Sequence, residues 1–342
     1  MNDADLRSDQ FNLKNVFATM LRGALGLAAL SFMIVTLIGL YGAVDAGFDV
    51  VNHFRIWIVL PALPLVLLAL VVKARAAAAM TLAALLVHAF AIVPEVYARW
   101  ATQSGESGAD RIKIVTLNMR FNFADAERLK QFVETEQPDI LVMQEAWGKS
   151  ATAIDDLKEL LPFRADCVDQ YLCNLALLSR LPIAASKIEP ASGAGPAAAS
   201  PRMLSAEVKL DAVGRPDESA TIITTHLSWP LPPELQASQF RQLAQRIAGF
   251  DPQSVIVAGD FNSTPWSHAM QHYDTATPLR RVTHAVHTWP ARKRIAGYEL
   301  PFPLLPIDHV FAGSRFRAES VRRGPYLGSD HFPVIVEFSI AD

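Results

Sequence analysis

Three long apolar segments occupy the first hundred residues of the chain. Residues 23–44 and 56–72 contain no charged side chain, and the only titratable side chain in residues 76–93 is His88. A hydrocarbon core about 30 Å thick needs roughly 20 apolar helical residues, with about 17 as a lower limit. The pattern therefore predicts an N-terminal membrane anchor, residues 1–100, with three transmembrane helices. A signal peptide would explain only the first segment.

The basic residues around these segments predict an orientation. Arg7, Lys14 and Arg22 precede the first segment, and Lys73 and Arg75 separate the second from the third. Short cytoplasmic loops carry an excess of Lys and Arg, so the N-terminus and this loop are expected in the cytoplasm. The sequence thus predicts a multi-pass protein of the cytoplasmic (inner) membrane, in contact with the lipid bilayer, whose C-terminal domain lies on the extracytoplasmic side.

After the anchor, a Gly- and Ser-rich linker is expected at residues 101–110, followed by an α/β domain at 111–342. Short apolar runs alternate there with helical patterns, and near-continuous apolar strands indicate sheets covered on both faces. The predicted strands are 112–117, 140–143, 175–178, 203–210, 221–225, 255–258, 307–311 and 334–338, and the predicted helices are 124–136, 154–161 and 233–250.

Composition changes this picture in one respect. The chain is 51% hydrophobic and 19% charged, but only 13 of its 65 charged residues fall within residues 1–100. The average therefore mixes an apolar anchor with a domain of ordinary composition, and it excludes a disordered protein. The net charge of −3 excludes a strongly basic protein that coats nucleic acid.

Polar residues recur where the predicted apolar strands begin or end. Each alone fits a turn or a solvated strand end, but strand ends are also where α/β scaffolds place ligand groups. The segments are Thr116-Leu117-Asn118, Gln144-Glu145, Thr225-His226-Leu227, Gly259-Asp260-Phe261-Asn262, Ile307-Asp308-His309 and Ser329-Asp330-His331.

Together these side chains suit one kind of chemistry. Carboxylates and an amide oxygen are hard ligands for Mg²⁺ or Mn²⁺, and imidazole and amide groups can donate to phosphoryl oxygens. Asp260 and Asn262 lie two residues apart, so in an extended segment they face the same way. Phosphodiester hydrolysis needs this combination of metal, water-activating carboxylate and phosphate donors. A zinc hydrolase is disfavoured because the His residues lack zinc-type spacing.

The order of these six segments resembles the endonuclease/exonuclease/phosphatase superfamily, with its deoxyribonuclease-like nucleases and neutral sphingomyelinases, here as a membrane-anchored bacterial-type member. The resemblance covers about residues 111–340. It implies a four-layer sandwich of two mixed β-sheets flanked by helices, preceded here by three transmembrane helices. It also implies an Mg²⁺- or Mn²⁺-dependent phosphoesterase whose substrate is DNA, RNA or a phospholipid headgroup.

The resemblance further assigns roles. Metal ligands would be Asn118, Glu145 and Asp330, and catalytic residues would be His226, Asp260, Asn262, Asp308 and His331. Among these, Asp260 would orient or deprotonate water, Asn262 and His226 would hold the phosphate, and Asp308 would fix the tautomer of His331. His309 is expected to be structural.

Four points stay open at this stage. The family's usual Glu before the strand at 175–178 is missing, so the orienting partner of His226 is either Asp169 or Asn174 or is unassigned. Trp266 either lines the substrate site or packs at its rim. Cys167 and Cys173 form a disulfide or remain two thiols. A non-catalytic membrane scaffold that retains the fold is the alternative function, and nothing in the sequence indicates a protein partner.

Overall fold

The computed structural model describes residues 3–101, 110–121, 125–168, 170, 172–191, 200–292, 294–295, 298–299 and 302–341. The chain divides into two compact units, Met1–Pro94 and Glu95–Asp342. The expected linker at 101–110 falls almost entirely outside the described residues, so its boundaries stay a prediction.

The first unit is helical. It contains α1 (Asp3–Tyr41), the 3₁₀ helix η1 (Ala46–Phe54), α2 (Arg55–Val71) and most of α3 (Arg75–Ala101). Three stretches are long and apolar enough to cross a membrane, which confirms the three predicted helices and supports membrane association. Two prolines, Pro61 and Pro64, lie inside α2, where neighbouring helices can compensate the lost backbone hydrogen bonds. The number of passes and the orientation stay predictions.

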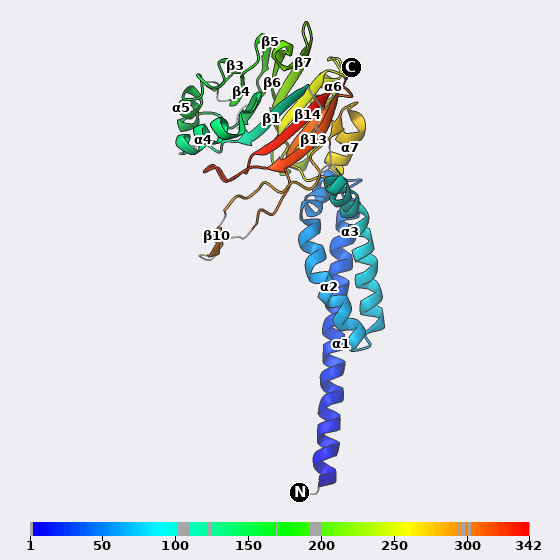
Figure 1. The fold of residues 1–342 in the computed structure, drawn as a ribbon. Helices are drawn as coiled ribbons and strands as arrows, with labels where there is room; N and C mark the ends of the chain where they lie inside the picture. Colours follow the sequence, from blue (N-terminus) through cyan, green and yellow to red (C-terminus); the bar gives the residue numbers. More distant parts are fainter. Residues whose placement is uncertain are drawn as a thin grey trace. The chain divides into compact units, whose positions relative to one another are not determined.

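The second unit is built on two six-stranded mixed sheets (Figure 1). The strand order of the first sheet is β13 (Phe316–Arg323), β14 (Val334–Ile340), β1 (Arg111–Asn118), β2 (Ile140–Gln144), β4 (Leu175–Ser179) and β3 (Phe163–Asp166). The order of the second is β5 (Ile183–Glu189), β6 (Arg202–Lys209), β7 (Ser219–His226), β8 (Val255–Asp260), β12 (Asp308–Ala312) and β9 (Arg280–Arg281). A separate short pair is formed by β10 (Arg294–Ile295) and β11 (Tyr298–Glu299).

Three apolar clusters define the layers. The largest lies between the sheets and takes side chains from both, such as Ile114 of β1 and Ile256 of β8. A second packs α4 (Ala126–Glu136) and α5 (Lys149–Asp155) on the outer face of the first sheet. A third packs α6 (Pro233–Ile247) and α7 (His268–Ala276) on the outer face of the second. This confirms two mixed sheets flanked by helices.

Some elements differ from the sequence prediction. The helix expected at 154–161 was wrong in position: α5 runs from Lys149 to Asp155, and turns follow it. The edge strand β5 was not predicted, because all of its residues are exposed or half-buried and its sequence lacks the long apolar run of a core strand. The strand β13 was missed for the same reason, since polar residues alternate with its buried positions.

Cys167 and Cys173 form a disulfide in the structure, which leaves no free cysteine in the chain. The bond closes the turn between β3 and β4, and both residues are buried in the core between the sheets. Of the two alternatives for these residues, the structure therefore has the disulfide.

Candidate active site

Strand register in the second sheet brings three of the predicted residues into one row. Strand β7 pairs parallel with β8 and sets His226 opposite Asp260. Strand β12 pairs antiparallel with β8 on its other side and sets Asp308 opposite the same Asp260. The parallel pair needs Gly259, because a Cβ there would lie 2.1 Å from the carbonyl oxygen of Thr225. The glycine of Gly-Asp-Phe-Asn thus permits the alignment of His226 with Asp260.

The first sheet contributes Asn118 and Glu145 from its own parallel pair, β1 and β2. Asn118 lies opposite Gln144 at the strand ends, and Glu145 follows with a left-handed φ of 52°. The Nδ2 of Asn118 donates to Glu145 Oε1 at 3.1 Å and to Asp260 Oδ2 at 2.9 Å. One amide therefore bridges the two sheets at the centre of the site.

Left-handed backbone recurs in the site. Besides Glu145, both Arg120 and Asn262 have φ of 48°. Non-glycine residues in this region carry a strain of order 1–3 kcal/mol, and such residues cluster at functional sites. Each directly follows or lies within two residues of a strand end, and the turn there redirects the chain after the last ladder hydrogen bond.

Asp260 and Asn262 face the same site, as predicted. The backbone N–H of Asn262 donates to Asp260 Oδ1 at 2.8 Å. Its side-chain Nδ2 donates to the carbonyl of Leu227 at 2.9 Å and lies 3.3 Å from His226 Nε2. Both residues are almost fully buried, so their positions are set by the protein rather than by solvent.

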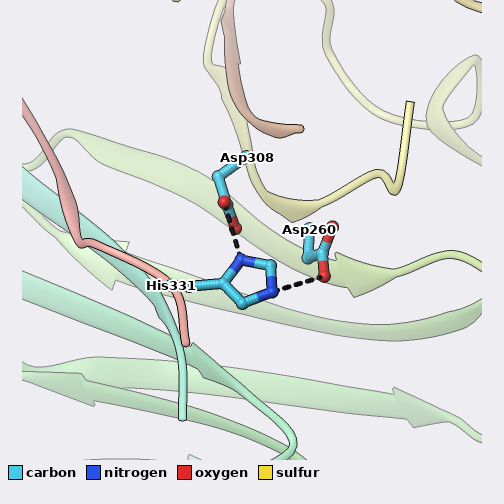
Figure 2. A group of neighbouring side chains, drawn as sticks. All are labelled: Asp260, Asp308 and His331. Atoms are coloured by element: carbon cyan, nitrogen blue, oxygen red, sulfur yellow. Dashed lines mark hydrogen bonds and ion pairs between the residues drawn. The ribbon is translucent and has the colours of Figure 1, made fainter. Parts of the chain in front are cut away.

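Asp260, His331 and Asp308 form a compact group (Figure 2). His331 Nδ1 lies 2.9 Å from Asp308 Oδ2, and its Nε2 lies 3.8 Å from Asp260 Oδ2. Asp308 Oδ2 also accepts a hydrogen bond from Thr288. Asp308 and His331 are therefore in contact through Nδ1, and Nε2 is directed toward Asp260; the role of Asp308 in fixing the tautomer stays a prediction.

Burial and charge shift these groups in opposite directions. Burial raises the pKa of Asp260 to about 7, and the neighbouring Asp308 acts in the same direction, against His331 and the hydrogen bonds from Asn118 and Asn262. At His331 burial lowers the pKa, but Asp308 and Asp260 outweigh burial and raise the pKa to about 10. At neutral pH these shifts favour a protonated His331 ring, with Asp260 close to the midpoint of its own titration.

The first histidine is in a different environment. Burial lowers the pKa of His226 to about 4, although Glu145 acts against burial. Its Nε2 lies 3.6 Å from Asp260 Oδ2 and 3.8 Å from Glu145 Oε1. The described contacts of the ring all involve Nε2. Asp169 lies outside the described residues and Asn174 is buried, so the orienting partner of His226 stays open.

Asp330 lies at the edge of this arrangement. Its side chain is about one-third exposed, and its Oδ2 is 3.8 Å from Arg120 Nε. The backbone N–H of Arg120 in turn donates to Asn118 Oδ1 at 2.9 Å. The described contacts thus connect Asp330 to Asn118 through Arg120 rather than directly, and its role as a metal ligand stays a prediction.

Trp266 and His309, which lie outside the predicted catalytic set, are both buried by the fold. Trp266 is fully buried, and its ring lies 6.3 Å from that of His287. It presents no surface to a substrate in this structure, which fits the packing alternative. His309 is also buried, between Thr283 Oγ1 at 3.1 Å and the carbonyl of Ser263 at 2.8 Å, as expected of a structural histidine.

Sequence reasoning did not assign several supporting residues. Ser329 donates to the carbonyl of Asn118 at 2.6 Å and accepts from the N–H of His331 at 3.0 Å. Ser329 is the first residue of the Ser-Asp-His segment, but its type and position alone do not indicate this contact with Asn118. Gln144 donates to Thr224 Oγ1 at 2.9 Å and connects the two sheets beneath the site. Thr288 could not have been found, because nothing in the sequence links it to Asp308.

The carboxylate of Glu145 fits a divalent metal. Its Oε2 accepts from the N–H of Phe121 at 3.1 Å, yet about one-third of the side chain remains exposed. Burial opposes its ionisation, but His226 and the N–H donors of Phe121 and Asn118 outweigh burial and hold the pKa of Glu145 below its usual value. A charged, partly open oxygen donor is what Mg²⁺ or Mn²⁺ requires.

Asp260, Asp308 and His331 are also close enough together to hold an ion. The Nδ1 of this histidine is already hydrogen-bonded, however, and the protonated ring supplies the charge that balances the carboxylates. The group is therefore better suited to proton handling, and Glu145 to the metal.

Comparison with known proteins agrees with this architecture. The chain resembles D. rerio TDP2 complexed with a single-strand DNA product (TM-score 0.53, 16% identity, 67% of this chain and 99% of that chain). It also resembles the endonuclease/exonuclease/phosphatase from Bacteroides vulgatus (TM-score 0.51, 19% identity, 67% and 99%). Likeness at such identities shows the fold alone. No curated protein sequence matches the chain significantly.

The sequence itself gives the more direct result. The model of the Endonuclease/Exonuclease/phosphatase family matches residues 115–331, which include every site residue described above and more than half of the chain. The chain belongs to the endonuclease/exonuclease/phosphatase family.

Proposed function

We propose that this protein is a membrane-anchored, metal-dependent phosphodiester hydrolase that acts by attack of water at phosphorus. The observation that carries the proposal is that side chains from both sheets converge on Asp260. This carboxylate lies in register with His226 and Asp308 and accepts a hydrogen bond from Asn118, which also contacts Glu145. The family consists of hydrolases of phosphoester bonds, and the intact set of polar residues supports an active member.

Each side chain has a role that follows from its position. Asp260 is buried with a pKa near neutrality, so it can accept a proton from the attacking water. Asn262 and His226, which adjoin it, offer N–H donors to the non-bridging phosphate oxygens. His331 is held by Asp308 through Nδ1, and its Nε2, 3.8 Å from Asp260 Oδ2, can donate toward the phosphate or the leaving oxygen.

Glu145, with Asn118 and Asp330, would hold the divalent metal. In the structure the Asn118 amide group donates to two carboxylates, so ligation through its oxygen requires that side chain to turn. When bound, Mg²⁺ or Mn²⁺ would neutralise phosphate charge and make water a better nucleophile. The metal could thus attract and neutralise the phosphate although the chain as a whole has a net charge of −3.

The test is a substrate panel on the full-length chain in detergent micelles. Bis-aryl phosphate, DNA, RNA and phospholipid diesters are each assayed with Mg²⁺ or Mn²⁺ and after addition of EDTA. EDTA-sensitive hydrolysis of at least one diester is expected. Absence of such turnover on every substrate would instead favour the non-catalytic scaffold, and calorimetry without a heat of metal binding would support that alternative.

The site is further proposed to face the extracytoplasmic side of the cytoplasmic membrane. The support is the Lys and Arg bias around the apolar helices, together with the Cys167–Cys173 disulfide, which suits an oxidising compartment. A C-terminal alkaline phosphatase fusion should be active and a C-terminal green fluorescent protein fusion exported by the Sec pathway should be dark. The opposite pattern would place the domain in the cytoplasm.

A further inference from the structure

A cavity of about 690 Å³ lies in the second unit at the edge strands of both sheets, β9 and β13. Its lining includes Glu95 and Ala101 from the last turns of α3, which belong to this unit. It shares no residue with the candidate active site. Its volume falls in the range of small-ligand pockets, and nothing in the proposed hydrolysis uses it.

One wall of this cavity is fixed by a buried ion-pair network around Arg281. Its side chain is only 5% exposed. Its guanidinium binds Glu95 through two hydrogen bonds, at 2.7 and 2.8 Å, and Asp274 at 2.8 Å. His284 Nδ1 lies 2.9 Å from the same Glu95. These groups satisfy one another, so this wall is preformed and does not itself need a ligand.

The lining also includes a carboxylate oxygen, Oε2 of Glu319, that has no hydrogen-bond partner among the described residues. Glu319 is 8% exposed. Its Oε1 accepts from Ser339 Oγ at 2.6 Å, while its Oε2 is buried without a hydrogen-bond partner among the described residues. The register between β13 and β14 shifts between Ala318 and Ser320, so Glu319 is the extra residue of a bulge. Bulges re-aim side chains, and an unpartnered buried carboxylate oxygen calls for a donor.

Two arginines complete the lining on the exposed side. The side chain of Arg317 is 75% exposed, and its Nε lies 3.5 Å from Glu319 Oε1. Arg280 is exposed as well and donates to the carbonyl of Phe316 at 3.3 Å. Guanidinium groups pair with phosphate oxygens. The cavity therefore presents a site for an anionic phosphate next to a site for a hydrogen-bond donor.

The position of the cavity along the chain suggests where such a ligand comes from. Glu95 follows the apolar stretch that ends at Val93, and Ala101 is eight residues beyond Val93 on the same helix. At 1.5 Å per residue, Glu95 lies about 3 Å and Ala101 about 12 Å beyond Val93 along the helix. The headgroup layer on each side of the hydrocarbon core is about 5–8 Å thick, so Glu95 falls within this layer and Ala101 just outside it. Lipid headgroups are therefore the phosphate-containing molecules nearest to the end of α3.

We propose that this cavity binds the headgroup of a phospholipid that carries a primary amine, phosphoethanolamine. The ammonium group donates to Glu319 Oε2, and the phosphate pairs with Arg317 and Arg280. Phosphocholine has the same charges but no N–H, so it cannot satisfy the buried oxygen. The site is an accessory lipid site of the anchor-proximal part of the domain, separate from catalysis.

The test is lipid retention by the full-length chain, purified in micelles that contain equal amounts of phosphatidylethanolamine, phosphatidylcholine and phosphatidylglycerol and measured by native mass spectrometry. We expect retention of phosphatidylethanolamine over phosphatidylcholine. Loss of one charge-assisted hydrogen bond in Glu319→Gln should reduce that retention by about tenfold. Millimolar free phosphoethanolamine should displace the lipid, and free phosphocholine should not.

Two further variants make the test decisive. Glu207→Gln removes a half-exposed carboxylate on β6, away from the cavity, where Glu207 pairs with Lys209 of the same strand, and it should leave retention unchanged. Arg317→Gln alters an exposed side chain that folding does not require, and it should weaken retention even if Glu319→Gln misfolds. Equal retention of the ethanolamine and choline lipids would overturn the proposal. So would retention that neither Glu319→Gln nor Arg317→Gln reduces, or that phosphoethanolamine does not compete.

Discussion

Replacement of Asp308 by Asn tests the proposed histidine pair with little change of shape. Two donors, Thr288 Oγ1 and His331 Nδ1, converge on Asp308 Oδ2, while its Oδ1 is buried without a hydrogen-bond partner among the described residues. The Asn oxygen should therefore take the Oδ2 position and keep both hydrogen bonds. The ring keeps its orientation, but the negative charge that stabilises the imidazolium is lost.

The magnitude follows from that exchange. A charge-assisted hydrogen bond contributes about 1.5–3 kcal/mol and a neutral one about 0.5–1.5 kcal/mol. This difference in hydrogen-bond free energy acts mainly in the transition state, in which His331 donates its proton, so kcat should fall by about tenfold. The low dielectric of the buried site can raise the effect up to about a hundredfold. KM for a small diester should change little. Because the Oδ1 position already has no partner among the described residues, the amide NH₂ placed there should change folding stability little.

The assay is steady-state hydrolysis of bis(4-nitrophenyl) phosphate well below the melting temperature of each variant. Asp139→Asn is the matched control, because Asp139 is also a buried carboxylate, paired with Arg180, but precedes β2 at the end away from Glu145. It should lose stability and keep kcat. A loss of kcat below threefold in Asp308→Asn, or an equal loss in Asp139→Asn, would refute the assigned role.

Three further predictions follow from single features. Glu145→Gln should abolish the calorimetric heat of Mg²⁺ binding while the fold is retained. Unchanged binding would show that the metal site does not include Glu145. Gly259→Ala should lower stability by about 1–3 kcal/mol through overpacking, measured by thermal melting, whereas Gly249→Ala, whose Cβ would meet its nearest atom at 3.3 Å, should have a small effect. Denatured, non-reduced protein should contain no titratable thiol, since Cys167 and Cys173 are bonded; two thiols would contradict the structure.

The core strands and the site residues could be predicted because they combine two local signals. Strands β2 and β8 are fully buried, so each reads as an apolar run, and a polar motif follows each run directly. Family order then placed Glu145 and Asp260 in one site although 115 positions separate them in the sequence. The hydrogen bond between Asn118 and Asp260 shows that the end of β1 in the first sheet lies next to the end of β8 in the second.

The remainder depends on contacts between distant segments. Thr288 supports Asp308 only because the chain before β12 folds back over it, and a lone threonine carries no sequence signal. The same holds for Glu319, whose buried oxygen results from a bulge in β13. Trp266 shows the opposite case, since an aromatic residue next to a catalytic motif suggested substrate contact, whereas the packing of the fold buries it completely.

The most direct test of the central claim compares the full-length wild-type chain with Asp260→Ala in the same detergent, with bis(4-nitrophenyl) phosphate and Mg²⁺ or Mn²⁺. The proposed metal-dependent hydrolysis at Asp260 predicts turnover by the wild-type chain that EDTA stops and added metal restores, and no measurable turnover by the variant. Full activity of Asp260→Ala, or wild-type turnover that EDTA leaves unchanged, would contradict it.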